Sequence, residues 1–206
     1  MIPDIFKSYR YVLASKSPRR QQLLKEMGFD FEVSVRAVYE IYPPDLQADA
    51  IAKYLCELKA SAFTDKELEK DQILITADTI VWHNEMVLGK PVDKDEAFNM
   101  LRTLSGSMHE VFTGICLKSA FRQNSFTDRS EVYFKKLTDK QLYHYIELCK
   151  PYDKAGSYGV QEWMGYVGVE KIVGSFYNVM GFPTHKFYEQ LEYFIEIQTT
   201  KRDIEY

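Results

Sequence analysis

The sequence has few cysteines and no long apolar run. Its three cysteines, Cys56, Cys116 and Cys149, are far apart, and none belongs to a CxxC pair. This spacing argues against a zinc site and a disulfide framework, so we interpret all three as reduced core thiols. No apolar run approaches the ~18 residues that a membrane span needs, and the N-terminal segment lacks an apolar signal core. We therefore expect a cytoplasmic protein with no membrane partner.

A surplus of basic residues is also absent. The 206 residues include 26 Lys and Arg against 30 Asp and Glu, a formal net charge of −4. A general nucleic-acid-binding surface needs the opposite balance, so we expect no nucleic-acid partner, but a local basic pocket for a small anion is compatible with this composition. Aromatic residues make up 15% of the chain, which is ample core material. The length predicts one domain over residues 1–206, or two closely merged lobes.

The signatures of several enzyme classes are missing. The chain has no GxxxxGK[ST] segment, which argues against a Walker-type nucleoside triphosphatase. Ser15 and Ser17 lack a GxSxG context, which argues against a hydrolase triad. The histidines at positions 83, 109, 144 and 185 form neither an HExxH motif nor a paired-ligand spacing, so we interpret each as an ordinary residue.

Predicted strands and helices alternate along the chain. The pattern predicts strands over residues 11–14, 29–35, 73–82, 86–88, 110–117, 131–134 and 166–172. It predicts helices over residues 18–27, 46–64, 94–104, 138–148 and 183–197. This order favours an α/β fold, with a mixed sheet flanked by helices.

Residues 15–20, with the sequence SKSPRR, are the most informative segment. Ser17 suits a helix N-cap and Pro18 the first helical position, which puts Arg19 and Arg20 in the first turn. Cations there oppose the helix dipole and cost ~0.3–1 kcal/mol each. The conflict disappears if an anion binds at the helix end, where N–H groups, hydroxyls and guanidiniums would converge on it. Two solvated arginines on a surface helix are the alternative.

Asp78 interrupts an otherwise apolar predicted strand. A buried, unpaired carboxylate is unfavourable, so Asp78 is a candidate metal ligand or general base toward a water. A structural Asp that caps a turn is the alternative. Thr79 follows it and points to the opposite face of a regular strand. Glu40 is, by position alone, an ordinary carboxylate.

Two lysines lie in glycine-containing loops. Lys90 belongs to a GKP segment and Lys154 to a DKAGSYG segment. Glycine allows close backbone approach, so either lysine can reach a phosphate, and an ordinary surface lysine is the alternative. Together these features favour an enzyme or binder of a small phosphorylated ligand that uses a divalent ion.

Several segments, in order and at matching spacing, resemble the Maf-like nucleoside triphosphate pyrophosphatases. They are LASKSPRR (13–20), ADTIV (77–81), GKP (89–91), LSG (104–106), TG (113–114), KAGSYGVQ (154–161) and GFP (181–183). The resemblance covers almost the whole chain. It implies a cytoplasmic housecleaning enzyme that hydrolyses a nucleoside triphosphate to the monophosphate and pyrophosphate with Mg²⁺ or Mn²⁺. It also implies an elongated, twisted sheet with two lobes around a central cleft, similar to inosine-triphosphate pyrophosphatases.

Three positions of the resemblance concern the substrate. Arg19, Thr79 and Gln161 fall where the subfamily acting on dTTP and UTP carries Arg, Thr and Gln. The subfamily that prefers 7-methyl-GTP has a tryptophan in place of Arg19. The resemblance therefore implies a dTTP/UTP pyrophosphatase. Another nucleotide preference, such as 7-methyl-GTP, and a non-catalytic nucleotide-binding regulator of septum formation are the alternatives, and a homodimer is possible.

Carried over residue by residue, the resemblance makes Asp78 the catalytic acid/base or a metal ligand, with Glu40 as a further metal-holding acid. The candidate phosphate-binding residues are Ser15, Ser17, Arg19, Arg20, Lys59, Lys90 and Lys154. The sequence departs from the family pattern at three places. Tyr39 stands where a second acid is often found, Leu58 replaces a glutamate before Lys59, and Trp163 replaces a smaller residue.

Overall fold

The computed structural model describes the backbone of residues 2–204 and the side chains of residues 2–197. The strands are β1 (Arg10–Leu13), β2 (Phe31–Val33), β3 (Gln72–His83), β4 (Met86–Leu88), β5 (Met108–Lys118), β6 (Gln123–Phe134) and β7 (Val169–Val173). The helices are α1 (Asp4–Lys7), α2 (Pro18–Glu26), α3 (Asp49–Ser61), α4 (Lys94–Leu104), α5 (Asp139–Cys149), α6 (Trp163–Val167), α7 (Phe176–Met180) and α8 (Thr184–Ile204), with short 3₁₀ turns at Asp65–Glu67 and Ala155–Ser157.

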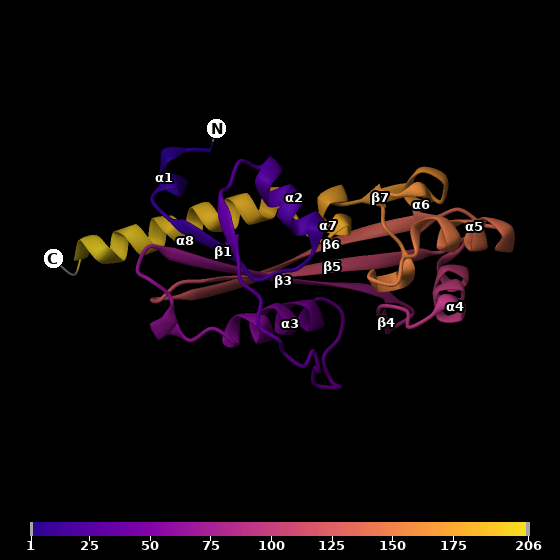
Figure 1. Ribbon diagram of the computed structural model, residues 1–206, viewed down its shortest axis with the longest axis horizontal. Helices are drawn as coiled ribbons and strands as arrows, with labels where there is room; N and C mark the ends of the chain where they lie inside the picture. Colours follow the sequence, from indigo (N-terminus) through magenta and orange to yellow (C-terminus); the bar gives the residue numbers. More distant parts are fainter. Residues whose placement is uncertain (1, 205–206) are drawn as a thin grey trace.

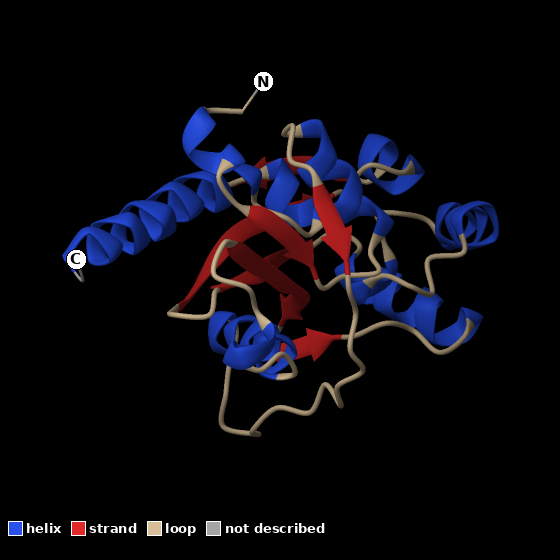
Figure 2. Ribbon diagram, turned by 60° about the vertical axis from the view of Figure 1, so that its left-hand side comes forward, coloured by secondary structure: helices blue, strands red, loops and turns tan. Residues whose placement is uncertain are grey.

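One mixed sheet organises the molecule. Within the described residues it has seven strands, in the order β2-β1-β3-β5-β6-β7, and β4 pairs with β3. The molecule is elongated along this sheet (Figure 1), and helices lie on both faces of the twisted strands (Figure 2). The predicted α/β fold with helices flanking a mixed sheet is confirmed. The predicted domain over 1–206 includes residues 1, 205 and 206, which lie outside the described residues, and its division into two lobes stays a prediction.

The strand β3 is only partly covered along one edge. On that edge β1 runs parallel to it as far as the Leu13–Ile75 pair, and β4 begins at the Val81–Leu88 pair. On the other edge β5 pairs with it continuously from Leu74 to Trp82. Residues 76–80 of β3 therefore lie between its two partners on the open edge. Ligands of open α/β sheets gather beyond the carboxyl ends of parallel strands, and β1 ends at this gap.

Alternate residues of β3 face different helices. Ile75 and Ala77 belong to a core cluster that includes residues of α2 and α8, whereas Ile80 packs with residues of α3. The helix α3 lies very close to β5 at Gly114. A Cβ added at this position would be only 2.3 Å from the carbonyl oxygen of Ala52, so only glycine permits this approach. Since Gly114 pairs with Asp78 in the sheet, α3 is held against the strand residue expected to carry the chemistry.

Two sequence predictions about secondary structure are wrong. Residues 166–172 do not form one strand, because α6 continues to Val167 and β7 begins only at Val169. The alternation of apolar and polar residues resembles that of a strand, but it belongs partly to a short helix. In that helix the Met164 side chain is completely buried in the core, whereas Tyr166 is exposed. In addition, β6 begins at Gln123 and not at position 131. Its first residues are mostly polar, so no apolar alternation reveals them.

The short helix α7 was not predicted. Ser175 caps its start by accepting a hydrogen bond from the Asn178 backbone N–H, and Gly181 ends it with a φ of 104°. Five residues are too few to show helical periodicity in a sequence. In the part of the chain that the structure describes, no helix has both the length and the apolar character needed to cross a bilayer.

The buried His109 couples stability to pH. Its Nε2 lies 2.7 Å from the Tyr158 hydroxyl, and its ring packs edge-on against Phe134. Burial, with a smaller contribution from the charge of His83, lowers the pKa of His109 from 6.5 to about 3. The unfolded chain therefore binds one more proton than the folded protein between these two pH values. Stability contributed by the neutral ring is present above pH 6.5 and is lost as the pH falls toward 3.

We expect His109→Gln to weaken this pH dependence, because glutamine does not titrate and still offers a polar group to Tyr158. Below pH 6.5 the unfolding free energy of the wild type should fall more steeply, by up to about 1.4 kcal/mol per pH unit, than that of the variant. Urea unfolding at pH 7.5, 6 and 5 measures both slopes. Equal slopes for the two proteins would contradict the assignment.

Candidate active site

A cavity of about 460 Å³ lies at the gap in the β3 edge. Its wall includes the turn between β1 and α2, the middle of β3, the segment after β2 and the loop before α6. The structure brings together every site residue that the sequence predicted. All of them line this one cavity: Ser15, Ser17, Arg19, Arg20, Glu40, Lys59, Asp78, Thr79, Lys90, Lys154 and Gln161.

The cavity concentrates positive charge in an acidic protein. Among the side chains that the structure describes, its wall contains seven cationic ones, those of Lys16, Arg19, Arg20, Arg36, Lys59, Lys90 and Lys154. It contains three carboxylates, those of Glu40, Asp78 and Asp153. The excess of cations favours a polyanionic ligand, because opposite charges attract strongly in a partly enclosed, low-dielectric site.

The turn between β1 and α2 has the predicted N-cap and helix start. The Ser17 hydroxyl accepts a hydrogen bond from the backbone N–H of Arg20, and Pro18 is the first helical residue. The Ser15 hydroxyl accepts from the backbone N–H of Ser17 at 3.2 Å. The first turn of α2 contains no acidic residue. An anion in the cavity would therefore be the negative charge that the helix dipole favours at this end.

The guanidinium of Arg20 is largely used by the protein itself. Its Nε donates to the carbonyl of Gly181 at 2.9 Å. Its Nη1 donates to the carbonyl of Ala77 at 2.8 Å and to the Ser15 hydroxyl at 3.4 Å. Its Nη2 donates to the Thr79 hydroxyl at 2.9 Å. Since a guanidinium has five N–H groups, the contacts to described residues leave one donor for a ligand.

Arg19 is less engaged and faces the cavity more freely. Its Nε donates to the Met180 carbonyl at 3.3 Å, and its Nη1 lies 3.6 Å from a carboxylate oxygen of Asp153. About a quarter of its side chain is exposed, at 26%. Of the two arginines at the helix start, Arg19 therefore has more donors available for a phosphate group, while Arg20 mainly holds the cavity wall together.

Lys59 joins the two carboxylates that were predicted to hold a metal. It projects from α3, and its ammonium donates to Asp78 and lies 3.1 Å from Glu40. The Asp78 side chain is only 13% exposed, so this ion pair lies at the inner wall of the cavity. The predicted change of face at Thr79 is confirmed, because Asp78 contacts α3 whereas Thr79 contacts Arg20 from the α2 side.

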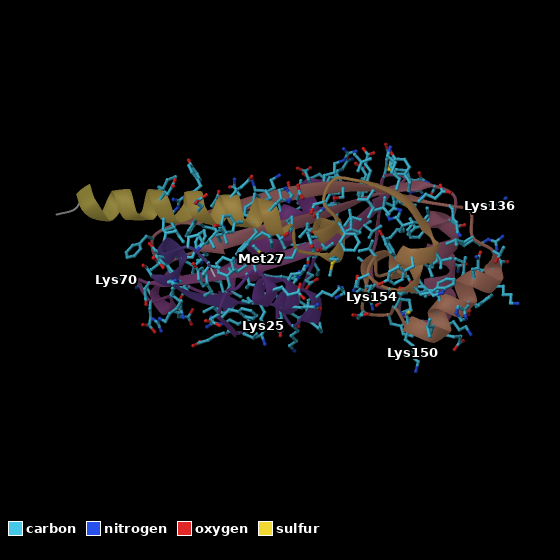
Figure 3. All side chains as sticks on the ribbon, turned by 90° about the horizontal axis from the view of Figure 1, so that it is seen from above. Lys25, Met27, Lys70, Lys136, Lys150 and Lys154 are labelled. Carbon is cyan, nitrogen blue, oxygen red and sulfur yellow. The ribbon has the colours of Figure 1, made fainter. Side chains whose placement is uncertain are left out.

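The two loop lysines differ in their surroundings. Lys154 is almost fully buried, and its ammonium lies 2.6 Å from Asp153 and 3.1 Å from Glu162. These two carboxylates neutralise it, so its main contribution is to the structure of the wall. Lys90 is exposed at the cavity mouth, and its charge can move toward a bound phosphate. Figure 3 labels Lys154 together with lysines that lie outside the cavity, such as Lys25 and Lys150.

Two charged residues of the cavity, Arg20 and Asp153, have shifted pKa values. Burial lowers the pKa of Arg20, and the charge of Asp78 opposes this change. Burial alone would raise the pKa of Asp153, but the hydrogen bond and charge of Lys154 outweigh it and lower that pKa. Asp153 is therefore a carboxylate at neutral pH, beside Arg19.

Gln161 offers a further polar group. Its side-chain oxygen is buried and has no hydrogen-bond partner among the described residues. Buried acceptors in proteins are nearly always paired, so a ligand N–H or hydroxyl in the cavity would satisfy this one.

Three charged residues of the cavity wall were not predicted from the sequence. Lys16 and Asp153 lie directly beside predicted site residues, and that adjacency was the available signal. Arg36 lies in the segment after β2, where it donates to the carbonyl of Ala62 and pairs with Glu67. Nothing in the local sequence indicates that this segment returns to the cavity.

Known proteins match most of the chain. Residues 10–194 match the model of a family described as Maf-like protein. A dTTP/UTP pyrophosphatase of Flavobacterium johnsoniae is 49% identical over 191 residues, which cover 93% of this chain and 98% of that protein. A dTTP/UTP pyrophosphatase of Parabacteroides distasonis is 47% identical, with 91% and 97% covered. Among solved structures, the Ham1 protein of Staphylococcus aureus is 12% identical with a TM-score of 0.45, covering 61% of this chain and 71% of that one.

Proposed function

The chain belongs to the Maf-like protein family, and we propose that it hydrolyses dTTP and UTP to the corresponding monophosphate and pyrophosphate. The observation that carries this proposal is the cavity, in which a helix N-terminus and several cations face the Lys59–Asp78 ion pair. Relatives at 49% and 47% identity carry the name dTTP/UTP pyrophosphatase. Arg19, Thr79 and Gln161, the substrate-linked positions of the resemblance, all line the cavity. We propose housecleaning of the cytoplasmic nucleotide pool as the role of this activity, and the homodimer stays a prediction.

The cations are placed to hold the triphosphate. Arg19, at the start of α2, presents side-chain donors to phosphate oxygens, and Lys90 adds a charge at the mouth. Arg20 contributes its charge and one donor. Hydrogen bonds between charged groups and phosphates are short and strong, so they fix the chain of phosphates relative to Asp78.

The proposed reaction is attack of water on the α-phosphorus. A bond forms between the water oxygen and this phosphorus, the bond to the α,β-bridging oxygen breaks, and pyrophosphate leaves with that oxygen. Asp78 accepts a proton from the water, because it is the least exposed of the cavity's three carboxylates. Arg19 stabilises the negative charge that develops on the phosphate oxygens, and Lys59 holds the Asp78 carboxylate in position.

The residues present suit a divalent cation. Asp78 and Glu40 face one point, because both lie against the ammonium of Lys59. Among the described side chains, no three His, Cys, Asp or Glu residues form a complete metal cage. Mg²⁺ usually binds one or two carboxylates and takes its other oxygens from phosphates and water. Asp78 and Glu40 would hold Mg²⁺ or Mn²⁺, which supplies positive charge to the triphosphate oxygens.

Pyrophosphate release from a panel of nucleotides tests the proposal. With Mg²⁺ and dTTP, UTP, CTP, GTP or 7-methyl-GTP, we expect kcat/KM for dTTP and UTP to exceed the others by about tenfold or more. A preference for 7-methyl-GTP would overturn the substrate assignment. Saturable protection of the fold against heat by nucleotides, without any release of pyrophosphate, would support the alternative of a nucleotide-binding regulator of septum formation.

A further inference from the structure

We propose that Thr113 and Asn178 are positioning residues that hold the guanidinium of Arg20 through a hydrogen-bond relay of fixed direction. Both residues are completely buried. The hydrogen-bond relay connects them to the cavity through Thr79, whose hydroxyl accepts from Arg20. The proposal deepens the proposed function, on which it rests, because Arg20 belongs to the wall that would hold the triphosphate.

The direction of the relay follows from which groups can donate. Arg20 Nη2 donates to the Thr79 hydroxyl at 2.9 Å. The hydroxyl oxygens of Thr79 and Thr113 lie 2.9 Å apart, and Thr113 donates to the backbone carbonyl of Asn178 at 3.1 Å. A guanidinium only donates and a carbonyl only accepts. Each threonine therefore accepts from the Arg20 side and donates toward Asn178, and Thr79 presents only an acceptor to the cavity.

Asn178 fixes the far end of the relay. Its side-chain nitrogen donates to the carbonyl of Val111 on β5 at 3.0 Å and to the hydroxyl of Ser130 on β6 at 2.9 Å. Ser130 in turn donates to the carbonyl of Ser175 at 3.0 Å. The helix α7 is thereby tied to two strands of the sheet, although it is too short to be stable alone.

The same helix holds Arg20 a second time. It ends at Gly181, whose carbonyl accepts from Arg20 Nε. A Cβ at Gly181 would lie 3.2 Å from the Thr79 hydroxyl, so a larger residue would press on the relay. Both ends of the guanidinium are thus held by α7, one directly and one through the two threonines. This fixes the plane of the guanidinium and lowers the conformational cost of binding a ligand with its remaining donor.

A buried oxygen of Asn178 that lacks a hydrogen-bond partner in the described part of the chain agrees with a positioning role for this residue. The side-chain oxygen of Asn178 is buried and has no hydrogen-bond partner within the described residues. Such a group lowers stability. A side chain kept for packing alone would not need to be polar here, whereas the two donations from its nitrogen require an amide.

The test compares Thr113→Val, which removes the hydroxyl at constant shape, with Thr113→Ser, which keeps it. We expect Thr113→Val to raise KM for UTP, and the Kd for inorganic tripolyphosphate, by about tenfold. The change in kcat should be about threefold or less, and Thr113→Ser should stay within about twofold of the wild type in every constant. Nitrogen NMR of the arginine side chains should show faster exchange of the Arg20 Nη2 N–H groups, which the relay holds, in Thr113→Val only.

Equal KM and tripolyphosphate Kd in Thr113→Val, Thr113→Ser and the wild type would overturn the proposal. If Thr113→Val does not fold, Ser130→Ala replaces it, because this variant removes one acceptor of the Asn178 amide; the same increase of KM and Kd is expected, and no change would overturn the proposal. Absence of pyrophosphate release by the wild type would overturn the proposed function instead. Tripolyphosphate affinity then still tests the relay, since it needs no turnover.

Discussion

Asp78→Asn should reduce pyrophosphate release from UTP by about 100- to 10,000-fold in kcat, the range usual for loss of a general base. Asparagine keeps the shape of the side chain and can still accept the hydrogen bond from Lys59, so the cavity should keep its form. It cannot take a proton from water and is a poor partner for a divalent ion. Steady-state kinetics with Mg²⁺ and UTP measure the loss.

Asp139→Asn is the matched control for this variant. Asp139 begins α5 and pairs with Arg102 at the surface, so the same chemical change there should leave kcat and KM unchanged. Thermal unfolding of both proteins separates loss of catalysis from loss of fold. Wild-type kcat in a folded Asp78→Asn protein would show that Asp78 is not the catalytic carboxylate.

Arg19→Glu should raise KM for UTP by about 100-fold or more. The substitution replaces a cation with an anion beside the phosphates, and a charge pair ~4 Å apart near a protein surface contributes roughly 4 kcal/mol. The new carboxylate would also lie near Asp153, which now pairs with Arg19 at 3.6 Å. Binding of tripolyphosphate, measured by calorimetry, should weaken in parallel.

Lys25→Glu provides the control for this charge reversal. Lys25 lies in the last turn of the same helix and is exposed, so the net charge changes equally while the cavity does not. We expect its KM to stay within about twofold of the wild type at physiological ionic strength, where distant surface charges are screened. Wild-type KM and kcat in Arg19→Glu would refute the idea that the start of α2 binds the triphosphate.

The start of α2 could be predicted from sequence because its rules are local. A serine N-cap, a proline at the first helical position and two arginines in the first turn lie within four consecutive residues. The conflict between these arginines and the helix dipole is therefore visible in the sequence and predicts an anion. The different roles of the two arginines could not be predicted from the sequence. The N–H groups of Arg20 are used by hydrogen bonds to the carbonyls of residues 77 and 181, which are far away in the chain.

Long-range contacts explain the other differences. Lys59 was predicted as a site residue only from the family resemblance. Its contact with Asp78 depends on the close approach of α3 to Gly114, which the local sequence does not show. Lys154 was expected to reach a phosphate, but the fold of its loop places Glu162 and Asp153 against its ammonium. The roles of both lysines toward a ligand stay predictions.

The most direct test of the central claim is ³¹P NMR of UTP incubated with the purified protein and Mg²⁺. If the cavity hydrolyses the bond between the α- and β-phosphates, UMP and pyrophosphate should form in equal amounts, without UDP or inorganic phosphate, and Asp78→Asn should leave UTP intact. Formation of UDP and inorganic phosphate, or persistence of UTP with the wild type, would contradict the account.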